Sequence, residues 1–98
     1  MEHDENMRRL QLRFEGEVQG VGFRWTTRSV ANKIGATGWV RNEWDGSVSM
    51  ELQGRDEQIA EFFGRLVHAW GYYQPTYVIA QKEEIKTIPG EPDFRVRF

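Results

Sequence analysis

The stretch LQLRFEGEVQGVGFRWTTRSVANKIG, residues 10–35, changes its hydrophobic period in the middle. In its first part, every second residue is apolar or glycine, and the residues between them are polar. A period of two is typical of a strand with one buried face. After a glycine-containing loop, apolar residues recur at helical spacing, which predicts a helix over residues 25–33 that ends at Gly35. The expected buried face of the strand consists of Leu10, Leu12, Phe14, Gly16 and Val18.

The middle of the chain predicts a hairpin followed by a second helix. Strands are expected over residues 37–42 and 47–53, because an Asp-Gly pair between them is a strong hairpin signal. Gly54 is expected to end the second of these strands. An apolar stripe at helical spacing then predicts a helix that ends at Gly71. The stripe consists of Ile59, Phe62, Phe63, Leu66, Val67 and Trp70.

Two further strands complete the predicted order of elements, one within residues 77–85 and a short one over residues 94–98. The order strand–helix–strand–strand–helix–strand, with an extra C-terminal strand, predicts an α+β ferredoxin-like sandwich. Its sheet is expected to be antiparallel with both helices on one face, and its second strand is expected to pair with the first. A single domain is expected over residues 8–98, after a disordered tail of residues 1–7.

The composition excludes several kinds of site. The chain of 98 residues has no cysteine, which excludes disulfides, thiolate catalysis and cysteine-based metal centres. Its two histidines, His3 and His68, lie far apart in the sequence, so no metal site is expected. The net charge of −2, with acids and bases interspersed, weighs against a nucleic-acid partner.

The chain shows no targeting or membrane signal. Its start is polar and acidic, and no segment approaches the length of a membrane span. We therefore expect a soluble cytoplasmic protein with no membrane partner, acting as a monomer.

Residues 19–24 have the chemistry of an anion site. Gly20 and Gly22 permit backbone conformations that let an anion approach the main chain. Successive amides there can form a concave nest at the positive end of the following helix. Arg24 adds a planar guanidinium whose geometry suits phosphate oxygens. These features predict a phosphoryl-binding loop, although a tight turn with a solvated arginine accounts for the residues equally well.

Asn42 ends the segment Gly-Trp-Val-Arg-Asn at the close of the second predicted strand. If that strand pairs with the first, Asn42 lies beside the loop. A neutral amide can hold a water molecule without adding a charge that repels phosphate. From the residues alone, however, the better-supported interpretation is that Asn42 simply opens the hairpin.

Taken together, these segments resemble the acylphosphatase family. The resemblance is carried by the runs GEVQGVGFR (residues 16–24) and GWVRN (38–42), followed by DGSV (45–48) and QG (53–54), and it covers residues 10–67. It implies hydrolysis of a small acylphosphate by direct attack of water, without metal or cofactor. It also implies that Arg24 binds the phosphate and that Asn42 positions the water. The implied phosphate cradle consists of the backbone amides of Gln19, Gly20, Val21, Gly22, Phe23 and Arg24.

The chain departs from the family pattern after residue 68. The Gly-Pro turn and Ala-x-Val run that usually lead into the fourth strand are absent, and the aromatic stretch of residues 70–77 stands there instead. The path of the fourth strand and the role of this stretch stay open, with packing over the sheet favoured over an interaction surface. Single residues have ordinary interpretations: His68 caps the second helix, Asp45 is a turn residue, and Arg41 is a surface strand residue.

Two other classes of function are compatible with parts of the sequence. A binding module that kept the phosphate cradle without turnover would have little use for Asn42. RNA recognition occurs on the same fold class, but Phe23 lies at a loop–helix junction rather than in the middle of a strand, and the net charge is unfavourable.

Overall fold

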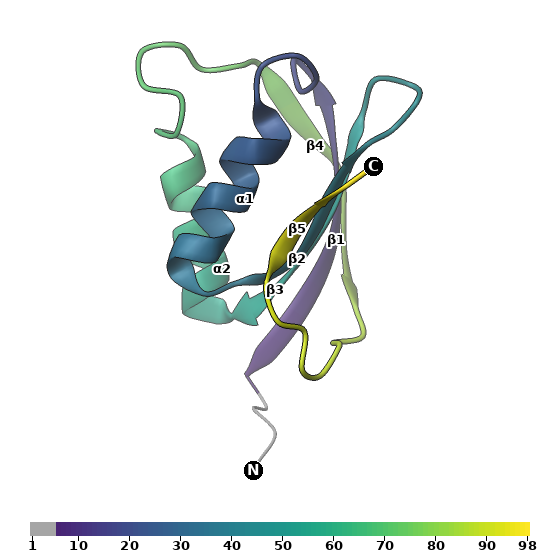
Figure 1. Ribbon diagram of the computed structural model, residues 1–98, viewed down its shortest axis with the longest axis vertical. Coiled ribbons are helices and arrows are strands. Elements are labelled where there is room, and N and C mark those ends of the chain that lie inside the picture. Colours follow the sequence, from purple (N-terminus) through teal and green to yellow (C-terminus); the bar gives the residue numbers. More distant parts are fainter. Residues whose placement is uncertain (1–5) are drawn as a thin grey trace.

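The computed structural model describes residues 6–98, which form five strands and two helices (Figure 1). Residues 1–5 of the predicted tail lie outside the described residues, and Met7, which the prediction placed in the tail, already belongs to the first strand. The elements in chain order are β1 (Met7–Gly16), α1 (Phe23–Ile34), β2 (Thr37–Asn42), β3 (Val48–Arg55), α2 (Asp56–Leu66), β4 (Tyr77–Ile85) and β5 (Phe94–Arg97).

The strands form one sheet in the order β4-β1-β3-β2-β5, and both helices cover the same face of it (Figure 1). The predicted α+β ferredoxin-like sandwich is therefore confirmed. The predicted pairing of the second strand with the first is wrong, because β3 lies between them. β3 places Leu52 opposite Leu10 of β1 on one side, and Val48 opposite Asn42 of β2 on the other.

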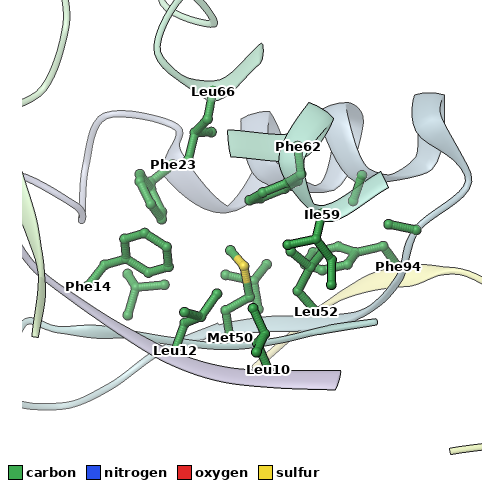
Figure 2. Packing of buried hydrophobic residues seen from close by; sticks show 14 of the residues in the cluster. Leu10, Leu12, Phe14, Phe23, Met50, Leu52, Ile59, Phe62, Leu66 and Phe94 are labelled. Carbon is green, nitrogen blue, oxygen red and sulfur yellow. The ribbon is translucent and has the colours of Figure 1, made fainter. Parts of the chain in front are cut away.

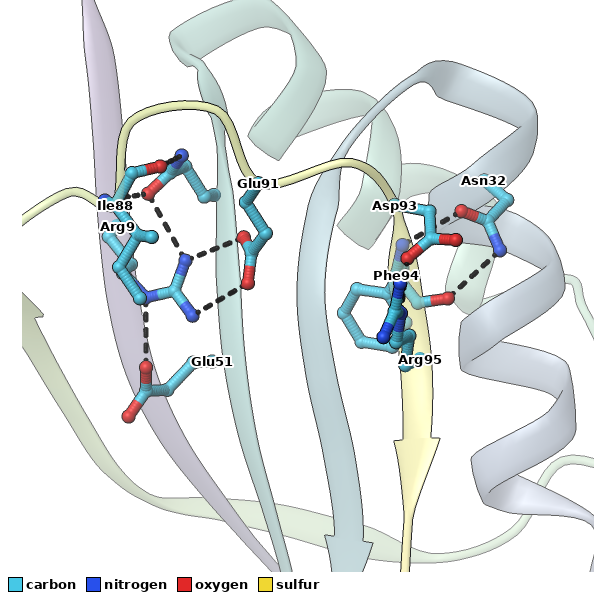
Figure 3. Close-up of polar contacts among 9 residues, drawn as sticks. Arg9, Asn32, Glu51, Ile88, Glu91, Asp93, Phe94 and Arg95 are labelled. Atoms are coloured by element: carbon cyan, nitrogen blue, oxygen red, sulfur yellow. Dashed lines mark hydrogen bonds and ion pairs between the residues drawn. The ribbon is translucent and has the colours of Figure 1, made fainter.

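The C-terminal strand departs from the predicted antiparallel sheet, because β5 runs parallel to β2, from the pair Gly38–Phe94 to the pair Arg41–Arg97. Since β4 is antiparallel to β1, it ends where β1 begins, and the chain crosses the sheet at that end. A strand that leaves this crossing must run in the direction of β1, which is also the direction of β2. The α1 residue Asn32 fixes its start, with an amide that donates to the Phe94 carbonyl at 3.1 Å and accepts from the Phe94 N–H at 3.0 Å (Figure 3).

The hydrophobic core lies between the sheet and the two helices (Figure 2). The predicted apolar face of the first strand is buried there, with Leu10, Leu12 and Phe14 at most 2% exposed. Phe62 of α2 is fully buried against this face, as the helical stripe predicted. The alternation and the stripe therefore identified most of the interior, but Gly16 and Val67, which were also predicted to be buried, are exposed.

The first helix begins at Phe23, two residues before its predicted start, and two of the glycines predicted to end an element do not do so. Gly54 does not end β3, since it still pairs with Arg8 of β1. The second helix ends at Leu66 instead of running to Gly71, and the residues that follow it form successive turns. Trp70 fits the apolar spacing although it lies in these turns and not in the helix. Its ring is covered by Phe23, on which it stacks with the ring centroids 5.6 Å apart.

Arg9, at a polar position of the predicted strand, is fully buried on the sheet face that the helices leave uncovered (Figure 3). The crossing segment before β5 covers it. Its guanidinium pairs with Glu51 at 2.8 Å and with Glu91 at 2.7 Å, and it donates to Gln53 at 3.1 Å. Burial alone would lower the pKa of Arg9, but the hydrogen bonds to Glu91 and Glu51 outweigh it and raise the pKa. The Gln53 side chain also bonds both backbone groups of Ile88, which fastens the crossing segment to the sheet.

Candidate active site

The loop between β1 and α1 presents a series of unused backbone donors. Gly20 and Gly22 have positive φ values of 81° and 74°, a region that glycine enters without strain. None of the hydrogen bonds found among residues 6–98 uses the backbone N–H of residues 19–24. These are the six amides that the family resemblance assigned to the phosphate cradle. They remain able to donate to an anion.

The beginning of α1 is electropositive, whereas the beginning of α2 is neutralised. No side chain caps α1, and its first turn contains no acidic residue. The first turn of α2 carries Asp56 and Glu57, and the Gln58 side chain accepts a hydrogen bond from the Arg55 N–H at 2.8 Å. Because the first N–H groups of a helix have no partner within it, the uncapped start of α1 favours a bound negative charge.

Arg24 is the second residue of α1, and its guanidinium lies over the Phe98 ring at 5.2 Å from the ring centroid. This guanidinium makes no hydrogen bond or ion pair with any residue in the range 6–98, whereas the backbone carbonyl of Arg24 accepts from the Thr27 hydroxyl. Contact with an aromatic face restrains a guanidinium without using its N–H groups. Five donors in a fork therefore remain available for the oxygens of an anion.

Asn42 is the last residue of β2, and its Oδ1 atom is buried without a hydrogen-bond donor among the described residues. Two other buried side-chain atoms of the described residues also lack a hydrogen-bond partner, the donor Arg13 Nε and the hydroxyl Thr37 Oγ1. Buried polar atoms are nearly always hydrogen-bonded. The acceptor capacity of Asn42 Oδ1 is therefore unused within the described residues.

Two contacts bring the loop and the end of β2 together. The Gln19 side chain donates to the carbonyl of Glu43, the residue after Asn42, at 2.8 Å, and to the Ser47 carbonyl at 2.9 Å. Phe98, whose ring contacts Arg24, follows Arg97, the partner of Arg41, and so lies beside Asn42. The loop, the β2–β3 hairpin and the C-terminus lie at one end of the fold (Figure 1). Asn42 thus comes close to the loop through these contacts, and not through the predicted pairing of strands.

Sequence reasoning missed the side chains of Gln19 and Phe98. It gave Gln19 a role only through its backbone amide, and it counted Phe98 as one residue of an alternating strand. No local signal identifies either contact, because each depends on a partner that is distant in the sequence. Gln19 reaches the hairpin 24 and 28 residues away.

Other residues singled out in the sequence lie outside this group. Asp45 is a turn residue, as predicted: its Oδ1 accepts from the Ser47 hydroxyl at 2.6 Å and the Ser47 N–H at 3.0 Å, and these bonds lower its pKa. Arg41 pairs with Glu43 at 3.1 Å on the strand surface. His68 is exposed in the turns beyond α2, and His3 lies outside the described residues. Within the described part of the chain, no group of three or more His, Cys, Asp or Glu residues could hold a metal ion.

A hollow of about 610 Å³ lies between α1 and α2, away from this site. Its lining includes Trp25, Lys33 and His68, but neither Arg24 nor Asn42. The candidate site is therefore the loop end of the sheet and not the groove between the helices.

Comparison with known proteins identifies the family of the chain. The acylphosphatase family model matches residues 10–96. An acylphosphatase from Rhizobium etli is 40% identical over 95 residues, covering 97% of this chain and 96% of the relative. One from Oceanobacillus iheyensis is 45% identical over 96 residues, covering 94% and 100%. The solved structure of an acylphosphatase from Coxiella burnetii is 30% identical, covers 95% of each chain and has a TM-score of 0.73. The chain belongs to the acylphosphatase family.

Proposed function

We propose that the amides of residues 19–24 and the Arg24 guanidinium bind the phosphoryl group of an acylphosphate, and that Asn42 positions the water that attacks it. Hydrolysis of the carboxyl–phosphate anhydride bond is the activity of this family, and the chain is an enzyme of that kind. One observation carries the assignment of residues: six unused backbone donors and a guanidinium without an acidic partner in the described chain meet at the uncapped start of α1.

Binding uses charge and direction together. The loop amides and Arg24 donate to the phosphoryl oxygens, and the start of α1 adds its partial positive charge. Donors that are already oriented need no rearrangement when charge builds up on these oxygens during the reaction. Phosphoryl transfer depends mainly on such positioning and electrostatic stabilisation.

The water molecule donates a hydrogen bond to Asn42 Oδ1, which directs its oxygen toward phosphorus. As the bond from water oxygen to phosphorus forms, the bond from phosphorus to the acyl oxygen breaks, and its electron pair leaves with the carboxylate. A carboxylate is a good leaving group and needs no general acid. Neither Asn42 nor a backbone amide can serve as a base, so the proton of the water passes to an oxygen of the phosphoryl group. The products are a carboxylic acid anion and inorganic phosphate.

The setting of the reaction follows from the same residues. All the groups involved belong to one chain, so a monomer acting on a small acylphosphate suffices, without metal or cofactor. No helix of the described residues is long and apolar enough to cross a membrane. A sequence without cysteine suits a reducing compartment, and we place the activity in the cytoplasm.

The decisive experiment measures benzoyl phosphate hydrolysis by the parent, Asn42→Ala and Asn42→Asp. Loss of water positioning should lower kcat by about 10²-fold in Asn42→Ala. The inhibition constant of inorganic phosphate should change little, because Asn42 holds water and not phosphate. Asn42→Asp keeps the shape of the side chain but adds a charge that repels the phosphoryl group. In this variant kcat should fall and the inhibition constant of inorganic phosphate should rise.

Urea unfolding shows whether each variant is folded, and a chelator arm tests the metal-free reaction. Parental turnover by Asn42→Ala would remove Asn42 from the mechanism. Loss of parental activity on adding chelator would contradict hydrolysis without metal.

A further inference from the structure

The connection between α2 and β4, residues 67–76, contacts the loop of residues 17–23 at its beginning, its middle and its end. It contains most of the aromatic stretch in which the chain departs from the family pattern. We propose that this α2–β4 connection holds the phosphate-binding loop in its binding geometry, with Trp70 and Glu17 as the positioning residues. The proposal rests on the function proposed above, since it explains how that loop is kept ready for phosphate.

The middle contact sets the direction of one cradle amide. Trp70 Nε1 donates a hydrogen bond to the Val21 carbonyl at 3.1 Å. In a trans peptide, the C=O and the following N–H point in opposite directions. All described peptide bonds are trans, so the bond to Trp70 makes the Gly22 N–H point away from the connection. Glycines on both sides of Val21 would otherwise leave this peptide free to rotate.

The end of the loop is fixed by ring packing. Trp70 stacks on Phe23, with ring centroids 5.6 Å apart and an interplanar angle of 19°. Phe23 also contacts Phe14 at 5.1 Å and Tyr77 at 5.5 Å, and it is only 1% exposed. Because Phe23 directly precedes Arg24, this cluster determines where α1 begins and where its arginine is placed.

The beginning of the loop is held through Glu17. Its carboxylate accepts from the Thr76 N–H and from the Tyr73 hydroxyl, each at 2.8 Å, and its own N–H donates to the Thr76 carbonyl at 2.7 Å. The two segments approach so closely at Gly16 that an added Cβ would lie 2.6 Å from the Thr76 carbonyl oxygen. The α2–β4 connection therefore fits against the loop along its length.

Such contacts affect binding because the donors are backbone groups. A loop with two positive-φ glycines loses much conformational freedom when it closes around an anion. Contacts that order it beforehand reduce this loss and so increase affinity. The connection should therefore influence phosphate affinity more than the chemical step.

The test compares Trp70→Phe with Trp39→Phe. Trp70→Phe keeps an aromatic ring against Phe23 but removes the donor to Val21. The Trp39 ring contacts the guanidiniums of Arg41 and Arg97, at 5.2 and 5.0 Å from its centroid, and its indole N–H makes no hydrogen bond among the described residues. The loss of one hydrogen bond predicts that Trp70→Phe raises KM for benzoyl phosphate and the inhibition constant of inorganic phosphate about fivefold, with a smaller change in kcat. Trp39→Phe should change neither.

A second matched pair tests the Glu17 contact. Tyr73→Phe removes a donor to Glu17, whereas Tyr72→Phe makes the same change at a neighbouring side chain that is fully exposed. We expect Tyr73→Phe to raise the inhibition constant of phosphate about twofold and Tyr72→Phe to leave it unchanged.

A measurement on the free protein separates this proposal from the proposed function. The ¹⁵N order parameters of the Gly20 and Gly22 amides should fall from about 0.85 toward 0.6 in Trp70→Phe and stay near the parental values in Trp39→Phe. Unchanged order parameters in Trp70→Phe, or equal losses in both tryptophan variants, would overturn the positioning role. A parent that neither binds phosphate nor hydrolyses benzoyl phosphate would refute the proposed function, and the order parameters would still decide whether the connection holds the loop.

Discussion

Two arginines, Arg9 and Arg24, have opposite surroundings in the same small fold. Arg9 is fully buried, and it directs its guanidinium to two carboxylates and an amide oxygen. Arg24 is partly exposed at the start of α1 and contacts a phenylalanine ring, with no acidic partner in residues 6–98. The protein therefore occupies the N–H donors of Arg9, whereas those of Arg24 remain available for a ligand.

This is the difference that we expect between a structural arginine and one that binds substrate. A guanidinium that the protein has already neutralised offers little attraction to an anion. One placed at an uncapped helix start, beside unused amides, is attractive to phosphate, and its charge has no other described partner. Identical substitutions at the two positions should therefore damage different properties.

Arg24→Met should have the largest effect, and on catalysis. Removing the charged donor from the phosphoryl group should lower kcat/KM for benzoyl phosphate by about 10³-fold, which corresponds to about 4 kcal/mol of transition-state stabilisation. The free energy of unfolding should change by less than about 1 kcal/mol, since no described ion pair is lost. Steady-state kinetics and urea denaturation on the same sample measure both. Activity within tenfold of the parent would contradict the role given to Arg24.

Arg9→Met should show the reverse pattern. The substitution leaves Glu51 and Glu91, which are only 19% and 13% exposed, without their cation. The free energy of unfolding should fall by about 3 kcal/mol, because removing one partner of a buried pair leaves the other uncompensated. The kcat/KM of the folded fraction should remain within about threefold of the parent. A large loss of activity in a fully folded Arg9→Met would show that the two regions are coupled.

The smallest effect concerns the carboxylate beside the loop. Hydrogen bonds from the Thr76 N–H first, and then from Tyr73, lower the pKa of Glu17 below its ordinary value of 4.5. A lowered folded-state pKa stabilises the protein above the unfolded pKa, and this stabilisation is lost as the pH falls through the folded pKa. The stability of the parent relative to Glu17→Gln should therefore shrink below about pH 4.5.

Urea unfolding of the two proteins between about pH 7 and pH 3 measures this change. Glu15→Gln removes an exposed carboxylate near the end of β1, together with its surface ion pair to Arg13, and controls for overall charge. Stability curves of the parent and Glu17→Gln that run parallel over the whole range would exclude a special role for the Glu17 carboxylate.

Local spacing predicted most elements of the fold but not the contacts between distant ones. The second strand was predicted over residues 37–42 and the fourth within residues 77–85, and both agree with the structure. Arg9 and Arg13 occupy equivalent polar positions in one alternating strand, yet only Arg9 is buried. The segment that buries it follows β4, about eighty residues along the chain, so no local pattern around Arg9 carries that information.

The residues of the candidate site also differ in how far the sequence alone could predict them. The glycines and Arg24 of the loop indicate an anion site by their own chemistry, whereas the role of Asn42 came from the resemblance and stays a prediction. The apolar spacing up to Trp70 predicted a helix that ends at Gly71, but α2 ends at Leu66, and the Trp70 side chain bonds the loop instead of continuing the helix. Periodicity predicts which apolar side chains turn inward, but Val67 of the same stripe is exposed, and the spacing does not say which element buries the others.

The pairing of β1 with β4 also has a kinetic consequence. It joins segments that are far apart in the chain, as in the ion pair between Arg8 and Glu84, which are 76 positions apart. Closing such a long loop costs chain entropy before the contacts that it allows can stabilise the fold. Folding should therefore be slow for a domain of this size. Trp70 and Thr76 reach the phosphate-binding loop from the segment that leads directly into β4. We therefore expect the loop to acquire its final shape only once this distant pairing has formed.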